Sequence, residues 1–334
     1  MQWLLSAVGA ALLGMLTNAL YDVMKYGTVR FPGVLRRRHL PAPARSHDVA
    51  GDGLDVLVTW SRARRLTPTL IDTVYEGRVA RDHVFDTPVW HEQVAANRAR
   101  GDAGRTAYLT SLSVDHGEHE AARRFTVGIA ESEYAEAMAT THLYRTDTEL
   151  RARMDQALTG TTDAFMAAVP PTSLTACVAV LSREGTFLLL RRSRSVRTFP
   201  LQWTVGINET MKYDDEPGAR EDLHSLPLRG LKEELGLEAE DVSSLLIGWL
   251  GWSRPAASFV TVNIARSRLT AAEIDERRGR CHSSYEHDAA AWWPLRPRTI
   301  ASVITGGPTP DDSTSWSYLA PLLAGELWRC RGDA

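Results

Sequence analysis

The chain has 334 residues, of which 44% are hydrophobic and 24% charged, and a formal net charge of -3. This length predicts more than one folded part, and the composition is that of ordinary folded protein. The charge argues against a general nucleic-acid-binding protein, which would carry a basic excess, and three cysteines without CxxC spacing argue against a structural zinc site.

The first predicted element is a transmembrane helix over residues 3–24. The stretch from Trp3 to Tyr21 contains no charged residue, and about 20 apolar residues are enough to cross a bilayer. One alternative is a cleaved signal peptide, although the residues before Trp3 lack the usual Lys or Arg. The other alternative is a buried helix of a soluble domain.

One face of this helix carries small residues. Ser6, Ala10 and Gly14 recur every four residues, a spacing that lets membrane helices approach closely, and Asn18 continues the stripe with a polar side chain. The stripe predicts a homo-oligomer that packs through the membrane helix. Because small residues are common in membrane helices, the stripe is equally consistent with no packing role.

Residues 25–48 form a predicted linker that contains prolines and clustered basic residues. The basic residues are Lys25, Arg30, Arg36, Arg37, Arg38 and Arg45. By the positive-inside rule they predict a single-pass protein of the inner (cell) membrane, with the C-terminal parts in the cytoplasm. Such a segment suits the surface of an anionic leaflet, and a nucleic-acid patch is the weaker interpretation.

Residues 49–169 predict an accessory α+β domain. One helix is expected to begin after an N-cap at Ser132, and a second opens with a capping box from Thr146 to Glu149 and stops before Gly160. The polar run from Asp115 to Glu120 fits a metal cluster less well than a turn between strands. The expected strands are Leu54 to Trp60, Leu70 to Tyr75, Tyr108 to Val114 and Phe125 to Ile129.

Pro170 and Pro171 mark the boundary to the predicted C-terminal domain, residues 170–334. A hairpin is expected at its start, with a turn at Arg183 to Gly185. The other expected elements are strands at Ser244 to Trp249 and Ser258 to Ile264, a helix at Ala271 to Arg278 and a closing helix at Trp316 to Trp328.

The central helix of this domain lies between Glu221 and Leu237. Pro227 can begin a helix because its missing N–H would be unpaired there, and Gly236 can end one. The leucines at helical spacing are expected to face the core; they are Leu228, Leu231 and Leu235.

Two adjacent acids lie on this helix. Glu233 and Glu234 are expected to project together from the side opposite the leucines, as a carboxylate pair that attracts a hard cation. Arg229, one turn before Glu233, is placed to orient it.

These positions resemble the Nudix box, Gly-x5-Glu-x7-Arg-Glu-U-x-Glu-Glu-x-Gly-U, in which U is aliphatic. The matching residues are Glu221, Arg229, Leu231, Glu233, Glu234, Gly236 and Leu237. The preceding hairpin and the segment Trp203 to Ile207 also resemble the flanks of Nudix domains, so the resemblance covers residues 171–300. It implies a Nudix α/β/α sandwich, a nucleotide ligand and a divalent metal such as Mg2+.

Two departures from the family pattern bear on activity. Gly230 stands where the family has the first Glu of Arg-Glu, a residue that belongs to its metal and base machinery. The run from Asn208 to Arg220, which includes Glu209, replaces a short loop. The resemblance therefore implies binding without turnover more than hydrolysis, with Glu233 and Glu234 as the catalytic residues if the protein is an enzyme.

The resemblance also suggests further site residues. Arg191 and Arg192, together with Arg229, could meet phosphate oxygens, and Trp203 could stack on a base. Glu286 could complete the metal site with Glu233 and Glu234, or it could be a solvated loop acid. His282 and His287 could contact phosphates or act as bases, although a loop histidine usually does neither.

A membrane helix, an intermediate domain and a degenerate Nudix domain in this order resemble the membrane-anchored Nudix effectors of bacterial CBASS antiphage systems. In that family a CD-NTase makes a cyclic oligonucleotide, the effector senses it, and the membrane is compromised. The resemblance implies a cyclic oligonucleotide ligand and cell death through membrane disruption. The alternatives are a membrane-tethered pyrophosphohydrolase that acts on a nucleoside diphosphate derivative, and a scaffold that binds only protein.

Overall fold

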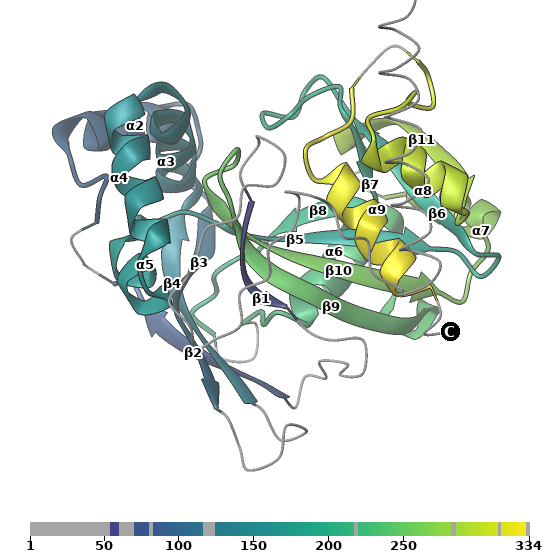
Figure 1. Ribbon diagram of the computed structural model, residues 1–334, viewed down its shortest axis with the longest axis horizontal. Coiled ribbons are helices and arrows are strands. Elements are labelled where there is room, and N and C mark those ends of the chain that lie inside the picture. The colour runs from purple at the N-terminus through teal and green to yellow at the C-terminus, as the bar shows by residue number, and fades with distance from the viewer. Residues whose placement is uncertain are drawn as a thin grey trace, which may run out of the picture.

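The computed structural model describes residues 54–59, 70–79, 83–115, 124–216, 220–281, 285–312 and 315–331. Within these ranges the chain is a mixed α+β structure with one eight-stranded and one three-stranded sheet (Figure 1), in agreement with the predicted class. The predicted membrane helix and linker, with Ser6, Ala10, Gly14 and Asn18, lie outside the described residues. Among the helices that are described, none is long and apolar enough to span a bilayer.

The three-stranded sheet has the order β2-β4-β3, with β2 parallel and β3 antiparallel to the central strand. Four helices gather beside it and form the smaller unit of the molecule (Figure 1). The elements are β2 (Ile71–Gly77), α2 (Pro88–Ala99), β3 (Arg105–Asp115), β4 (Arg124–Glu133), α3 (Tyr134–Thr146), α4 (Thr148–Thr159) and α5 (Thr162–Ala168). The predicted strands Tyr108 to Val114 and Phe125 to Ile129 are confirmed with wider bounds, and the one predicted at Leu70 to Tyr75 is shifted to Ile71–Gly77. Helices α2 and α5 were not predicted.

The N-caps of α3 and α4 lie one residue beyond the predicted ones. Glu133, and not Ser132, caps α3 in a reciprocal capping box. Asp147 caps α4, because its Oδ1 accepts from the backbone N–H groups of Glu149 and Leu150 at 3.0 Å each. Thr146 is still part of α3, and its hydroxyl donates to the carbonyl oxygen of His142 at 2.9 Å.

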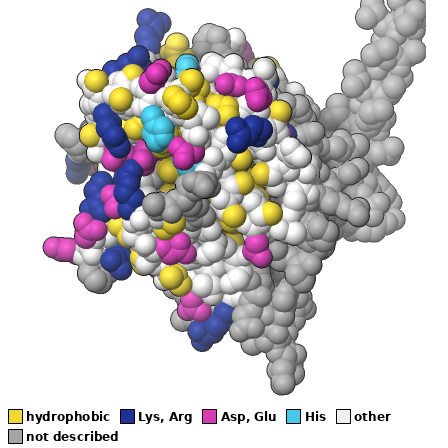
Figure 2. Space-filling view, turned by 90° about the vertical axis from the view of Figure 1, so that its left-hand side faces the viewer, with side chains coloured by type: hydrophobic (Ala, Val, Ile, Leu, Met, Phe, Trp, Pro, Cys, Tyr) yellow, Lys and Arg dark blue, Asp and Glu magenta, His cyan; other side chains and the backbone are white. Residues whose placement is uncertain are grey.

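Figure 2 shows the side of the molecule on which the smaller unit lies. Basic and acidic side chains are intermixed over this face, and no broad area of one sign is visible. The described part of this face therefore shows no basic stripe of the kind that nucleic-acid-binding proteins present.

The eight-stranded sheet has the main order β1-β9-β10-β5-β6-β11, with β7 paired to β6 and β8 paired to β5. Its strands are β1 (Leu54–Thr59), β5 (Leu174–Leu181), β6 (Thr186–Arg192), β7 (Trp203–Val205), β8 (Ile207–Thr210), β9 (Val242–Ser253), β10 (Ser258–Ser267) and β11 (His287–Pro294). The predicted hairpin is confirmed as β5 and β6. Strand β1 precedes the smaller unit in sequence but pairs antiparallel with β9, so the chain enters the larger sheet before it builds the smaller one.

Helices cover both faces of the larger sheet, with α9 in front and α6 behind in Figure 1. Because side chains alternate across a strand, β6 sends Leu188 and Leu190 to the core on the α6 side and Phe187 and Leu189 to the core on the α9 side. The helices of this part are α6 (Ser225–Leu235), α7 (Ala271–Arg278), α8 (Pro297–Ile304) and α9 (Ala320–Arg329).

The closing helix begins later than predicted. The expected start was Trp316, but α9 begins at Ala320 and has Pro321 in its first turn, where the missing N–H costs no hydrogen bond. Trp316 instead forms an isolated bridge with Trp203, and its indole N–H donates to the carbonyl oxygen of Gly307 at 2.8 Å.

Gly206 separates β7 from β8 and lets them pair with different strands. Its φ is +76°, and a Cβ atom there would lie 1.8 Å from the carbonyl oxygen of Val178. Only glycine fits both conditions. The turn directs β8, which carries Glu209, beneath α6.

Candidate functional site

Helix α6 begins two residues before Pro227 and ends where predicted. The Asp222 carboxylate accepts from the backbone N–H groups of His224 at 2.9 Å and Ser225 at 2.7 Å, which supplies the cap that the N-cap residue His224 lacks. Gly236 ends the helix in the left-handed region at φ +67°. The buried leucines Leu226, Leu231 and Leu235 anchor the helix to the sheet.

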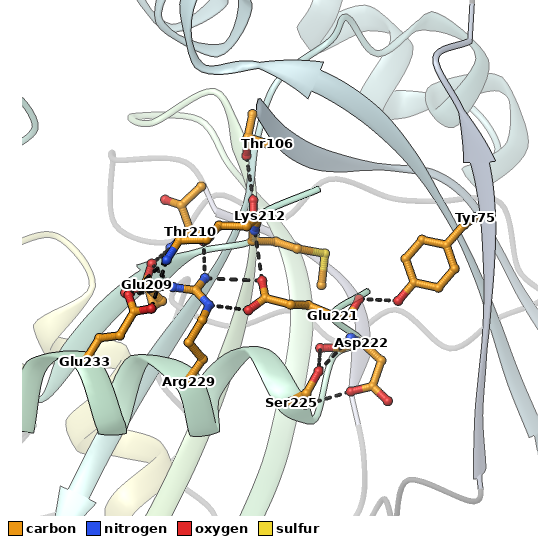
Figure 3. Close-up of polar contacts among 11 residues, drawn as sticks. Tyr75, Thr106, Glu209, Thr210, Lys212, Glu221, Asp222, Ser225, Arg229 and Glu233 are labelled. Carbon is orange, nitrogen blue, oxygen red and sulfur yellow. Dashed lines mark hydrogen bonds and ion pairs between the residues drawn. The ribbon is translucent and has the colours of Figure 1, made fainter. Parts of the chain in front are cut away.

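Arg229 lies at the centre of a group of carboxylates (Figure 3). Its Nη1 is 2.9 Å from Glu209 Oε1 and 3.0 Å from Glu233 Oε2, and its Nε donates to Glu221. Its Nη2 donates to the Thr210 carbonyl at 2.7 Å and to Glu221 Oε2 at 3.2 Å. A guanidinium has five N–H donors, and these five contacts use them all. Arg229 is thus a positioning residue, with no donor left for the phosphate contact that the sequence suggested.

Glu233 is turned toward this arginine and toward Lys212. The Lys212 Nζ lies 2.9 and 3.1 Å from the two carboxylate oxygens of Glu233. Burial alone would raise the pKa of Glu233, but the hydrogen bond from Lys212 and the charge of Arg229 hold it below its usual range. The predicted role of Arg229 in orienting Glu233 is confirmed by the 3.0 Å contact.

Glu234 points the other way, into the interior, and so the expectation that the two acids project together is wrong. Successive helical residues lie about 100° apart, which takes Glu233 to the rim and leaves Glu234 only 2% exposed. Among the described residues, neither of its carboxylate oxygens has a hydrogen-bond partner. Burial, followed by the charges of Glu209 and Glu286, raises the pKa of Glu234 well above its usual value.

Three further groups complete the surroundings of Glu234. The His287 Nδ1 lies 3.5 Å from Glu234 Oε2, and burial lowers the pKa of this histidine to about 3, with Arg192 and Arg278 adding to the effect. Burial raises the pKa of Glu286, the charge of Arg192 lowers it, and the charge of Glu233 raises it. Glu286 is therefore within electrostatic range of both residues. Arg192 pairs with His287 across β6 and β11, and its guanidinium donates to Thr198, whereas His282 lies outside the described residues.

Arg191 and Trp203 are not brought to this group. Adjacent residues of a strand face opposite sides, so Arg191 lies on the α9 side of β6, where its Nε donates to Asp288 at 2.7 Å and its Nη1 binds Asp311. Trp203 is buried in the same core, and its indole N–H donates to Asp311 at 3.1 Å. Both residues serve the packing of that face, away from the carboxylates of α6.

Glu209 was predicted only as one acid of the inserted run, and Lys212 was not predicted for the site at all. A Cβ atom at Gly230 would lie 2.7 Å from Glu209 Cβ and 3.0 Å from Glu209 Cγ, so the Glu209 side chain fills the space in front of that glycine. Ile207 is buried in the core with the leucines of α6, and Glu209 lies two residues on, hence on the same face of β8. Residues two apart on a strand share a face, and this alternation was the signal in the sequence that could have placed Glu209 beside α6.

The donors suit Mg2+, which prefers carboxylate oxygens, and the two unpartnered oxygens of Glu234 fit a cation. However, within the described ranges no three His, Cys, Asp or Glu side chains are grouped so that they could hold a metal ion. Glu233 in particular is engaged with Lys212 and Arg229. The site thus offers the right donor type without a closed set of ligands.

The smaller unit holds the segment that precedes α6 (Figure 3). The Thr106 hydroxyl donates to the Met211 carbonyl at 2.8 Å, and the Tyr75 hydroxyl donates to the Glu221 carbonyl. Arg105 binds both carboxylate oxygens of Asp215 at 2.7 and 2.9 Å. The remodelled segment, with Lys212 and Glu221, is therefore positioned by β2 and β3 of the other unit.

Thr106→Val is expected to lower the free energy of unfolding by about 1 kcal/mol, because it removes one buried hydrogen bond while the Met211 carbonyl keeps the Ala107 N–H. Urea unfolding measures this loss. Thr159→Val is the control, since its hydroxyl binds a carbonyl of its own helix at the surface. Equal midpoints for the two variants would show that the link between the units contributes nothing.

No family model and no curated protein sequence matches the chain. Among solved structures, it is similar to a protein of Deinococcus radiodurans, with 16% identity, 47% of this chain and 83% of that chain covered, and a TM-score of 0.34. A MutT protein from Methanosarcina mazei Go1 has 18% identity, coverages of 48% and 95%, and a TM-score of 0.31. The NUDIX domain of Shewanella oneidensis NrtR, cocrystallised with ADP ribose, has 16% identity, coverages of 47% and 86%, and a TM-score of 0.24. No ligand or activity of this chain follows from these similarities.

Proposed function

We propose that the α6 site binds the phosphate groups of a nucleotide ligand, and that the chain is a membrane-anchored receptor that responds to it. The observation that carries this proposal is the state of Glu233. Both of its oxygens are held by Lys212, and Arg229 binds one of them, so the carboxylate that would serve hydrolysis is already neutralised by the protein's own cations. Such a site favours holding a ligand over cutting it.

Lys212 is the group best placed to meet a phosphate. Its side chain is 57% exposed, so a phosphate oxygen can approach Lys212 from solvent while Arg229 and Lys212 still hold Glu233. The buried Arg192 adds positive potential behind Glu234 and Glu286. A Mg2+ ion held by Glu234 and its neighbours would supply neutralisation of the ligand's phosphate charge.

The finer part of this proposal concerns the ligand and the response. We propose a cyclic oligonucleotide as the ligand, produced during antiviral defence as in the CBASS effectors, and membrane disruption through packing of the N-terminal helices as the response. The support comes from the uncharged stretch Trp3 to Tyr21, its small-residue stripe and the basic residues after it. A homo-oligomer and an inner-membrane location with cytoplasmic C-terminal parts belong to the same proposal.

Dye-loaded vesicles containing the full-length chain test the receptor. Addition of cyclic di- and trinucleotides is expected to release the dye, and Lys212→Met is expected to raise the ligand concentration needed by about tenfold, the value of one charge-assisted hydrogen bond. Lys232→Met is the matched control, because Lys232 is on the same helix as the acids but pairs with the exposed Glu238, away from Glu233. A chain that binds none of these ligands and releases no dye would refute the receptor.

A second function is favoured by Glu209, which restores a carboxylate beside Gly230. With it, the protein would hydrolyse a nucleoside diphosphate derivative. The oxygen of water attacks one phosphorus, the bond from that phosphorus to the bridging oxygen breaks, and the leaving phosphate keeps the electron pair. A carboxylate of the site, Glu234 or Glu286, takes the proton of the water.

Product analysis separates the two functions. Incubation with ADP-ribose and Mg2+ is expected to give no AMP if the chain is a receptor. Rapid release of AMP that Glu234→Gln abolishes would instead establish the hydrolase.

A further inference from the structure

Lys212 is held in a closed ring of contacts that runs through α6. Its Nζ binds Glu233, and Glu233 binds Arg229 Nη1 at 3.0 Å. Arg229 in turn binds the carboxylate of Glu221. The ring closes at Glu221 Oε2, which accepts from the backbone N–H of Lys212 at 2.9 Å. The position of Lys212, at its backbone and at its Nζ, therefore depends on where Glu221 lies.

Glu221 is fixed by a side chain of the smaller unit. Tyr75 reaches across from β2, and its hydroxyl donates to the backbone carbonyl oxygen of Glu221 (Figure 3). Glu221 is 9% exposed, and its two carboxylate oxygens are engaged within the ring of contacts. Because the hydroxyl of Tyr75 binds the backbone, it orients Glu221 without competing for the carboxylate.

The aromatic ring of Tyr75 contacts the same segment at two more places. It meets Tyr213 edge-on, with the ring centroids 6.4 Å apart, and the guanidinium of Arg220 lies 5.0 Å from its centre. Arg220 also donates to two backbone carbonyl oxygens earlier in the segment. One side chain of the smaller unit therefore holds the residue that follows Lys212 and the two residues at the far end, Arg220 and Glu221.

We propose that Tyr75 is a positioning residue for Lys212, acting through Glu221, and that the smaller unit thereby regulates phosphate binding at Lys212. The inference rests on the proposed function, in which Lys212 meets a phosphate group of the ligand. Coupling between two places in a protein is reciprocal. A phosphate that fixes Lys212 therefore also strengthens the hold of the segment on β2.

The first test is the binding of inorganic pyrophosphate to the full-length chain, measured by isothermal titration calorimetry. Tyr75→Phe removes the hydroxyl and keeps the ring, and it is expected to weaken binding by about fivefold, a typical coupling between two sites. Tyr144→Phe is the matched control in the same unit. Its hydroxyl donates to Asp155 at 2.5 Å, away from the segment, so its loss should leave binding unchanged.

A double-mutant cycle distinguishes positioning from a general loss of structure. Lys212→Met alone is expected to weaken pyrophosphate binding by about tenfold. Adding Tyr75→Phe to it should change the affinity by less than about twofold, because the residue through which Tyr75 acts is already gone. Independent residues would instead multiply their effects to about fiftyfold. That result would show that Tyr75 does not act through Lys212, and the inference would be wrong.

Asp215→Ala tests the same hold at a position where folding is not at risk. The side chain of Asp215 is 76% exposed, and both of its oxygens bind Arg105 of β3 at 2.7 and 2.9 Å. Loss of a negative charge alone would strengthen pyrophosphate binding, whereas a loosened segment is expected to weaken it by about threefold. Glu216→Ala is the control, because it removes the same charge from the neighbouring exposed position. Tighter binding by both variants would contradict regulation by the smaller unit.

Failure of this inference and failure of the proposed function give different results. If Lys212→Met weakens pyrophosphate binding while Tyr75→Phe binds as tightly as the wild type, the site stands and the inference is wrong. If the wild type does not bind pyrophosphate, or Lys212→Met binds it equally well, the proposed role of Lys212 fails and the inference falls with it.

Discussion

Arg229→Met is expected to lower the free energy of unfolding by about 3–5 kcal/mol at neutral pH, the range found when one partner of a buried ion pair is removed. The side chain of Arg229 is 17% exposed, and those of Glu209 and Glu221 are 16% and 11% exposed. Removing the guanidinium leaves these two carboxylates beside Glu233 with little solvent and without their shared cation. Their mutual repulsion then opposes folding.

The pH dependence of this loss identifies its cause. Burial already raises the pKa of Glu209 in spite of Arg229, and without the arginine that pKa rises further. An acid whose pKa is higher in the folded than in the unfolded protein destabilises the fold above its unfolded pKa, and the penalty disappears as the pH falls and the folded protein takes up protons. The difference between variant and wild type should therefore shrink toward about pH 5.

Chemical denaturation at several pH values measures this difference. Arg280→Met is the control, since Arg280 is 72% exposed and pairs with the exposed Glu276, and its effect should stay within about 0.5 kcal/mol. A loss for Arg229→Met that does not change with pH would mean that packing, and not charge, accounts for the role of the arginine.

The sequence was most informative where local rules decide the structure. Gly236 ends α6 because only the left-handed region suits that position, and α7 has the predicted bounds because Thr270 and Glu273 form a capping box around its start. The β5–β6 hairpin follows from its turn residues. These features depend on residues that are close in sequence, which a single sequence displays directly.

Features that depend on contacts between residues far apart in the sequence were harder to predict. The pairing of β1 with β9 joins residues nearly 200 positions apart. The residue pattern of neither strand predicts which strand it pairs with. Glu209 was noticed only as one acid of an insertion, because its role depends on a contact with Gly230 across a strand and a helix. The 3.6-residue period of a helix could have predicted that Glu233 and Glu234 face different sides. We instead expected the two adjacent acids to project together and bind a cation, and this was wrong for Glu234.

The role of the middle of the chain could not be predicted from the sequence for the same reason. No motif there indicated a role, yet Tyr75, Arg105 and Thr106 hold the segment that carries Lys212 and Glu221. The contacts are one hydroxyl or one guanidinium each, which leaves no periodic trace in the sequence. The smaller unit thus helps to position the site. A ligand that moves Lys212 would also change the contacts of that unit.

Glu234→Gln is expected to raise the stability of the cation-free protein while it removes cation binding. The pKa of Glu234 is raised well above its ordinary value of 4.5, first by burial and then by Glu209 and Glu286. Above pH 4.5 the unfolded chain ionises at this position while the folded chain resists, so the wild type loses stability as the pH rises from 4.5 through the folded pKa. Glutamine has the same shape and does not ionise, and the variant should escape this loss.

Thermal and urea unfolding in EDTA, over this pH range, should show the variant gaining on the wild type as the pH increases. The lowered pKa of His287, which contacts Glu234, makes the protein less stable below about pH 6.5, so the comparison is cleanest above that pH. Saturating Mn2+ should reverse the order, because a ligand that binds only the folded state stabilises it by about 2.7 kcal/mol at 100 times its dissociation constant. The variant should lack that gain. Parallel pH profiles in EDTA, or equal stabilisation of both proteins by Mn2+, would show that the buried carboxylate of Glu234 is not kept for a cation.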